Sequence, residues 1–192
     1  MDRSITPSLT NTVSNNSARE ISFAHYALLL GVGGLLAGLH QGWDAHLGLP
    51  GHFGLIWMTG VMLARQRSSA TWAACIVAVG YAGGTAAFTG FAQHGLLQAP
   101  LYALSTLVVD MVWRLDSRRA AHLFGAALLG GLAFMLKPLV LLVFAQGLSL
   151  KLGALRAGPL FPLITHFSFG AVGAIIGTLL ARISSAAQRS RD

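Results

Sequence analysis

The chain has 192 residues, of which 54% are hydrophobic and only 10% are charged, and its formal net charge is +7 at pH 7. A soluble domain carries about 25% charged residues, so this composition excludes an ordinary soluble domain and indicates an integral membrane protein. The positive charge then serves as a topology signal and an attraction to the anionic inner membrane surface, rather than as a sign of nucleic-acid binding. The single cysteine, Cys75, excludes an internal disulfide and a thiolate metal cluster.

Six apolar stretches follow one another along the chain, and together they predict an all-α, polytopic membrane bundle over residues 21–183. The stretches are Ile21–Leu39, Phe53–Ala64, Ala70–Phe91, Leu96–Trp113, Ala120–Gln146 and Leu160–Ile183. A helix that crosses a bilayer needs about 20 apolar residues, so the short second stretch fits a tilted or re-entrant helix. The Lys137-Pro138 pair is expected to break the fifth helix, because proline removes a backbone donor.

The two ends of the chain are predicted to be cytoplasmic tails. Residues 1–20 are rich in Ser, Thr and Asn and contain no apolar core, so they predict a disordered tail rather than a cleavable signal peptide. Residues 184–192 form a basic tail. The first helix then acts as an uncleaved anchor.

Basic residues occupy every second gap between the stretches. Lys and Arg in short loops stay on the cytoplasmic side of a membrane. Ten basic residues lie before the first stretch or after the second, fourth and sixth, whereas two lie after the fifth, and Lys137 lies inside a stretch. This pattern predicts six membrane helices with both termini in the cytoplasm, as in a multi-pass protein of a bacterial inner membrane.

Small residues recur in the predicted helices, and the first stretch carries a small-xxx-small pair at Gly34 and Gly38 with Ala37 between them. Small residues let helix backbones approach closely in a membrane. Two interpretations follow from this pattern. The glycines pack the bundle itself, or the face formed by Gly34, Ala37 and Gly38 docks onto another membrane protein.

Ionisable groups inside a membrane are costly and are usually functional. Lys137 lies about 25 Å from the cytoplasmic start of its helix, at 1.5 Å per residue, and so falls in the outer half. It is either a lysine that extends its amine to the outer headgroups or part of a binding site next to a broken helix. His166 lies in the outer part of the sixth helix, where it contacts either a neighbouring helix or a ligand.

Further polar and aromatic residues are predicted at the outer side. His94 and Gln98 lie where the third and fourth helices meet outside, and Tyr102 is one helical turn deeper than Gln98. The first outer loop holds Trp43, Asp44 and His46, flanked by two more histidines. This loop is an interfacial segment with Trp43 in the aromatic belt, a lid over an external pocket, or a site for a divalent metal.

At the inner side, Asp110 is expected to pair with Arg114 at the i, i+4 spacing. The chain contains no phosphate-binding loop, nucleophile elbow, zinc-protease motif or dinucleotide signature. The sequence therefore predicts neither an enzyme nor a bound cofactor.

The layout resembles the substrate-binding S-components of energy-coupling factor (ECF) vitamin transporters. The resemblance rests on Gly34-Leu-Leu-Ala37-Gly38, the short second stretch and the run from Leu101 to Asp110. It implies a six-helix protein that captures a small ligand in an outer pocket and works with a transmembrane coupling subunit and ATPase subunits. Glycines stand where the family has an alanine docking motif. Asp2 stands where the nickel and cobalt members have histidine.

If the resemblance holds, the pocket comprises Lys137, His166, Gln98, Tyr102, His94, Trp43, Asp44 and His46. These groups suit a small vitamin or cofactor precursor with an anionic or hydrogen-bonding group. Two other functions stay open, namely a divalent metal-ion permease and a structural or assembly protein without a ligand.

Overall fold

The computed structural model describes residues 10–42, 49–89, 93–148 and 158–190, and these residues form helices joined by short turns, with no strand among them. The helices are α1 (Thr10–Gly42), α2 (Gly54–Arg67), α3 (Ala73–Thr89), α4 (Gln93–Leu115), α5 (Ser117–Ala120), α6 (Leu123–Leu148) and α7 (Leu160–Arg189). The prediction of an all-α fold is confirmed for this part of the chain.

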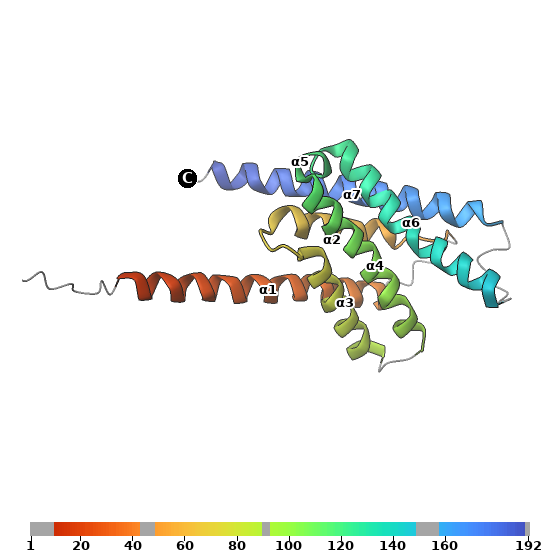
Figure 1. The fold of residues 1–192 in the computed structure, drawn as a ribbon, viewed down its shortest axis with the longest axis horizontal. Helices are drawn as coiled ribbons and strands as arrows, with labels where there is room; N and C mark the ends of the chain where they lie inside the picture. The colour runs from red at the N-terminus through yellow and green to blue at the C-terminus, as the bar shows by residue number, and fades with distance from the viewer. Residues whose placement is uncertain (1–9, 43–48, 90–92, 149–157, 191–192) are drawn as a thin grey trace, which may run out of the picture.

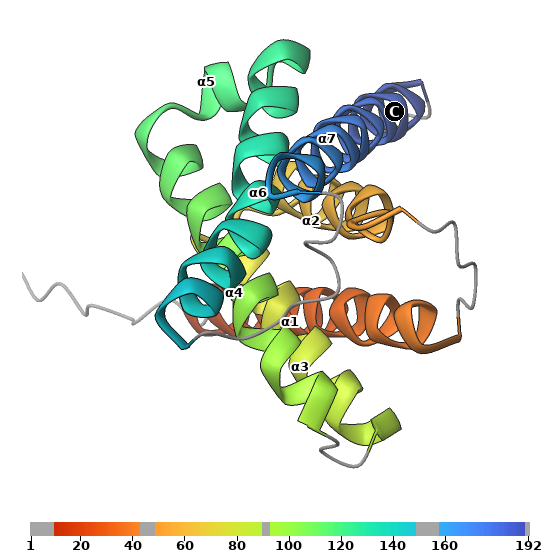
Figure 2. The same cartoon turned by 90° about the vertical axis from the view of Figure 1, so that its right-hand side faces the viewer.

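Two long helices run along the bundle in opposite directions, with α2 between them (Figure 1). These are α1 and α7, and the end-on view also places α2 between them (Figure 2). The α3, α4 and α6 helices complete the bundle at the side of α2. Because α2 lies inside the bundle, its 14 residues are surrounded largely by protein.

One end of the bundle gathers the segments in which the sequence concentrates its arginines. Three hydrogen bonds join them: His25 Nε2 with Ser68 Oγ at 2.6 Å, Arg67 Nη2 to Gln188 Oε1 at 2.6 Å, and Arg182 Nη2 to the Ala121 carbonyl at 3.0 Å. These bonds place the α2–α3 turn, the α4–α6 connection and the last turns of α7 on the same side, together with the α1 segment around His25. We call this side the basic end.

Glycines allow the helix backbones to approach closely. A Cβ added to Gly170 of α7 would lie 2.5 Å from the Gly130 carbonyl of α6, and one on Gly177 would lie 2.5 Å from the Thr59 carbonyl of α2. Likewise, a Cβ on Gly80 of α3 would lie 2.8 Å from Leu30 Cα of α1. Real Cβ atoms do not approach other atoms so closely, so glycine is required at these crossings. The prediction that the glycines pack the bundle is confirmed at these positions.

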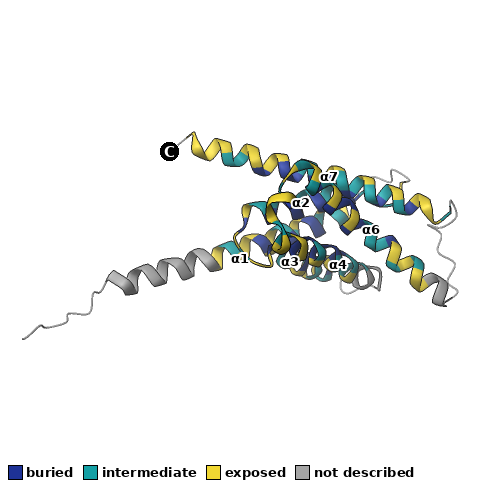
Figure 3. Cartoon of the chain, turned by 45° about the horizontal axis from the view of Figure 1, so that its top comes forward, coloured by how far each residue is buried: buried dark blue, intermediate teal, exposed yellow. Residues whose placement is uncertain are grey.

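Exposed residues run along the outward faces of the helices (Figure 3), and many of them are large hydrophobic residues. Large hydrophobic side chains that are more than three-fifths exposed include Phe23, Leu35, Val79, Phe124, Val143 and Ile183. Contiguous exposed apolar surface is typical of membrane contact. Three segments among the described residues are long and apolar enough to cross a membrane, namely Phe23–Gly42, Leu123–Phe144 and Leu160–Arg189. These features identify a membrane protein.

Several helix boundaries differ from the predicted ones. The α1 helix begins at Thr10, inside the segment 1–20 that was expected to be disordered, because an established helix extends with one added hydrogen bond per residue. The α6 helix runs through Pro138 without ending, so the predicted break is wrong. Proline removes one donor only, and membrane helices tolerate this loss when neighbouring groups compensate for it. The four-residue α5 helix was not predicted.

The close contact between α1 and α3 gives a matched pair of substitutions in one helix. Gly80→Ala places a methyl against Leu30 and should destabilise the protein by about 1–3 kcal/mol, the usual range for overpacking. Gly83 is exposed and an added Cβ would meet no atom within 4 Å, so Gly83→Ala should leave stability unchanged or raise it. Thermal unfolding in detergent, followed by tryptophan fluorescence, checks both. Equal melting temperatures for the two variants would contradict the packing described here.

Candidate functional site

The side chain of Lys137 lies at a polar contact between α6 and α4. Its ammonium donates to Gln98 Oε1 at 3.2 Å and to the Tyr102 hydroxyl at 3.1 Å. Gln98 and Tyr102 are one helical turn apart on α4, so both face α6. The structure thus brings together three of the residues that the sequence singled out, and we call them the Lys137 cluster.

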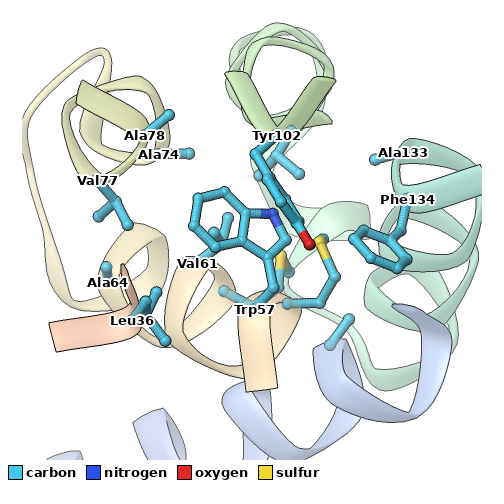
Figure 4. Packing of buried hydrophobic residues seen from close by; sticks show 14 of the residues in the cluster. Leu36, Trp57, Val61, Ala64, Ala74, Val77, Ala78, Tyr102, Ala133 and Phe134 are labelled. Carbon is cyan, nitrogen blue, oxygen red and sulfur yellow. The ribbon is translucent and has the colours of Figure 1, made fainter. Parts of the chain in front are cut away.

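Three buried aromatic rings, those of Trp57, Tyr81 and Tyr102, support this cluster, and we call them the aromatic layer. The Lys137 ammonium lies 4.3 Å from the centroid of the Tyr102 ring, within the range of a cation–π contact. The Tyr102 ring packs against Trp57 of α2 and Tyr81 of α3, with centroids 4.8 Å and 4.9 Å away. Figure 4 shows Trp57 and Tyr102 side by side at the centre of the core, their rings tilted by 56°, with Phe134 near Tyr102. These buried rings hold Tyr102 in place, and Tyr102 in turn positions the ammonium.

Two histidines flank the aromatic layer on opposite sides. His40 of α1 stacks on Phe53 with a centroid distance of 4.0 Å, and its Nδ1 shares a hydrogen bond with the Tyr81 hydroxyl. His166 of α7 stacks on Phe134 at 5.2 Å. Both rings lie near the side of the bundle opposite the basic end, because His40 is in the last turn of α1 and His166 is in the second turn of α7.

The hydrogen bond of His166 fixes which of its ring nitrogens remains an acceptor. Its Nδ1 lies 2.7 Å from the Pro162 carbonyl, which can only accept, so Nδ1 carries the proton and Nε2 of the neutral ring is an acceptor. The turn before α2 closes over this ring. Gly51 has φ +83°, and a Cβ there would lie 2.7 Å from the imidazole, so a glycine is required on both counts.

Other predicted site residues lie outside this geometry. Trp43, Asp44 and His46 fall in residues 43–48, outside the described residues, and the side chain of His94 in the first turn of α4 is likewise not described. Among the described residues, no group of three or more His, Cys, Asp or Glu side chains is arranged to hold a metal ion. The Lys137 cluster and His166 are therefore the parts of the predicted pocket whose side chains the structure describes.

The face predicted for partner docking lies against α3. Ala37 is fully buried, and a Cβ on Gly84 would lie 2.9 Å from Ala37 Cβ and 3.0 Å from Gly34 Cα. A Cβ on Gly38 would be 3.4 Å from the Phe88 ring. A partner that docked on this face would have to displace α3.

A second buried polar contact lies nearer the basic end. Asp110 of α4 is fully buried and accepts from the backbone N–H groups of Cys75 at 2.9 Å and Ala74 at 3.3 Å, and from Arg65 Nη1 at 3.4 Å. Arg65 also donates to the Ala70 carbonyl. The carboxylate thus caps the N-terminus of α3, where unpaired N–H groups and the helix dipole favour a negative charge.

The expected pair between Asp110 and Arg114 is wrong. The Arg114 guanidinium lies over the Trp72 ring, 4.5 Å from its centroid, whereas Asp110 faces the interior. An ion pair at the i, i+4 spacing contributes only about 0.2–0.5 kcal/mol. The Asp110 carboxylate therefore binds the buried donors of α2 and α3 instead of Arg114.

Sequence reasoning missed the aromatic residues that support the cluster, namely Trp57, Tyr81, Phe53 and Phe134. Each lies within an apolar stretch, where an aromatic residue fits a lipid-facing and a core position equally well. The one usable signal was the placement of Trp57 in a stretch too short to cross a bilayer alone, which implies burial in protein. Comparison with protein families, with curated proteins and with solved structures finds no match to this chain.

The buried and the exposed aspartate pairs give contrasting predictions. Asp110→Asn leaves the Arg65 charge buried without a counter-ion, so it should destabilise the protein by about 3–5 kcal/mol. Asp116→Asn removes an exposed pair with Arg119, which is worth about 0–1 kcal/mol. Chemical denaturation in detergent measures both. An Asp110→Asn variant as stable as Asp116→Asn would show that the buried contact does not hold the three helices.

Proposed function

We propose that the chain crosses the membrane six times, through α1, α2, α3, α4, α6 and α7, with the basic end and both termini in the cytoplasm of a bacterial cell. Alternate connections between these helices lie at the basic end, which supports an even number of crossings. Arginines gather at that end, as cytoplasmic loops require. The α2 and α3 helices have 14 and 17 residues, or about 21–26 Å at 1.5 Å per residue. They are short for a crossing, but burial against other helices supports short spans.

We infer that the function of this bundle is to capture a small ligand at the Lys137 cluster. The observation that carries the proposal is an amine held inside an apolar bundle by one amide oxygen and one hydroxyl, without a carboxylate among the contacts described. A charge in such a place is costly, and ion pairing with an incoming anion would lower the cost. The ligand class that fits is a small organic anion.

The wider role that we propose is the substrate-capture subunit of an ATP-driven importer for a vitamin or cofactor precursor. The absence of catalytic motifs in this sequence and the position of the Lys137 cluster opposite the basic end support this role. It requires a transmembrane coupling subunit and ATPase subunits. Because Gly34 and Ala37 pack on α3, the outward face of α1, with Leu28 and Leu35 exposed, is the better candidate for contact with the coupling subunit.

A structural function is the second candidate, because the same hydrogen bonds also join α4 to α6. The Lys137 ammonium then acts only as a cross-link between helices. The two functions differ in what replacement of Lys137 does to ligand binding and to stability.

Lys137→Met keeps the length of the side chain and removes its charge, so it should abolish capture of the ligand while lowering the melting temperature by only a few degrees. Tyr102→Phe removes one hydrogen bond to a charged group, worth about 1.5–3 kcal/mol, and should weaken binding about 10- to 150-fold. Native mass spectrometry of protein purified in mild detergent from its own host measures retention of the ligand.

The control for both variants is the thermal melt of each protein without added ligand. A wild-type chain that carries no small organic molecule, together with a large loss of stability in Lys137→Met, would contradict capture and favour the structural function. A bound divalent metal in place of an organic molecule would favour the metal permease.

A further inference from the structure

A groove runs along the outer surface between α4 and α6, and α5 closes one of its ends. Its volume is about 560 Å³, within the range of roughly 300–1,000 Å³ that is usual for small-molecule sites. Its walls are apolar and include Val108 and Val112 of α4 and Phe124, Leu128 and Leu132 of α6. We call it the α4–α6 groove. It is separate from the Lys137 cluster, none of whose residues lines it.

The length of the groove matches one leaflet of a membrane. Its lining runs from His122, just before α6, to Leu132 of α6, which is about 15 Å at 1.5 Å per residue. The hydrocarbon core of a bilayer is about 30 Å thick, so each leaflet is about 15 Å deep. A transmembrane helix of a partner would instead need a contact along the whole depth. The dimensions therefore favour a lipid acyl chain.

Excess positive charge surrounds the closed end of the groove. Asp116, Arg119 and His122 line it, Arg118 is exposed on the same short helix, and Arg182 donates to the Ala121 carbonyl beside it at 3.0 Å. Asp116 forms a 3.1 Å ion pair with Arg119 and offsets one charge. Three arginines against one aspartate leave a formal charge of +2, without counting the histidine. The Arg119 side chain is 90% exposed despite this ion pair, so a headgroup can reach it from outside.

We propose that the α4–α6 groove binds an anionic phospholipid of the leaflet at the basic end. One acyl chain lies between α4 and α6, and the phosphate lies against the arginines of α5 and Arg182. Basic pockets between membrane helices on the cytoplasmic side favour anionic headgroups in this way. The proposal rests on insertion of the bundle in a membrane, but not on ligand capture at Lys137.

The test titrates the full-length protein in mild detergent with phosphatidylglycerol or phosphatidylcholine of identical acyl chains and counts bound lipids by native mass spectrometry. The wild-type protein should prefer phosphatidylglycerol by about tenfold or more, since two charges near the surface contribute about 1 kcal/mol each. The double variant Arg118→Gln/Arg119→Gln should lose the preference. Arg189→Gln removes an exposed arginine near the end of α7, outside the groove lining, and should keep it.

A further variant tests the apolar part of the groove. Leu128→Trp fills the space between the walls and should reduce retention of both lipids, whereas the arginine variants change only the preference. If Leu128→Trp fails to fold, the surface arginine variants still decide the question. A wild-type protein that binds both lipids equally, or neither, would overturn the proposal and leave the groove to a partner helix or a second copy of the chain. Equal loss of preference in Arg189→Gln would overturn it as well.

Discussion

The arrangement of α2, α3 and α4 depends on the hydrogen bonds that the buried carboxylate of Asp110 accepts. In an apolar bundle this group persists only with donors around it, and it takes them from the end of α2 and the start of α3. The contact therefore sets the depth of the three helices relative to one another. Each of the three helices carries one aromatic residue at a similar distance from this contact. Trp57 precedes Arg65 by eight residues in α2, and Tyr102 precedes Asp110 by eight residues in α4. Tyr81 follows Ala74 by seven residues in α3.

These similar spacings bring the three aromatic rings to the same level of the bundle. Seven or eight residues of helix span about 10–12 Å, so the rings form one layer above the carboxylate. Their centroids lie 4.8 to 5.0 Å apart, and each side chain is almost completely buried. The layer holds Tyr102 under the Lys137 ammonium. The stability of the inner contact is thus connected, through three helices, to the geometry of the proposed site.

Glycine contacts complete the bundle around this layer. Gly130 and Gly170 bring α6 and α7 together, and Gly80 brings α3 onto α1. These crossings leave large apolar side chains on the outside, where a membrane accommodates them, and they leave the space between α4 and α6 open near α5. The packing that places Lys137 inside the bundle therefore also shapes the groove on its surface.

Much of this organisation could be predicted from patterns that local physics produces. Because basic residues occupy every second gap between the apolar stretches, the sequence predicted which connections lie at the same end of the bundle. The helical spacing of Gln98 and Tyr102 placed both on one face of their helix. The partner of Asp110 could not be predicted, because its donors come from residues 35 to 45 positions away in the chain. The aromatic layer was missed for the same reason, since an aromatic residue in an apolar stretch does not reveal which face is buried.

The claim that most needs a direct test is that the Lys137 cluster lies toward the outside of the cell while the basic end faces the cytoplasm. In a Cys75→Ser background, Leu49→Cys marks the side near His166 and Ser69→Cys marks the basic end; both native residues are exposed. Intact cells treated with a membrane-impermeant maleimide should label the Leu49→Cys protein and label Ser69→Cys only after permeabilisation. The opposite pattern would place the Lys137 cluster on the cytoplasmic side and contradict capture from outside.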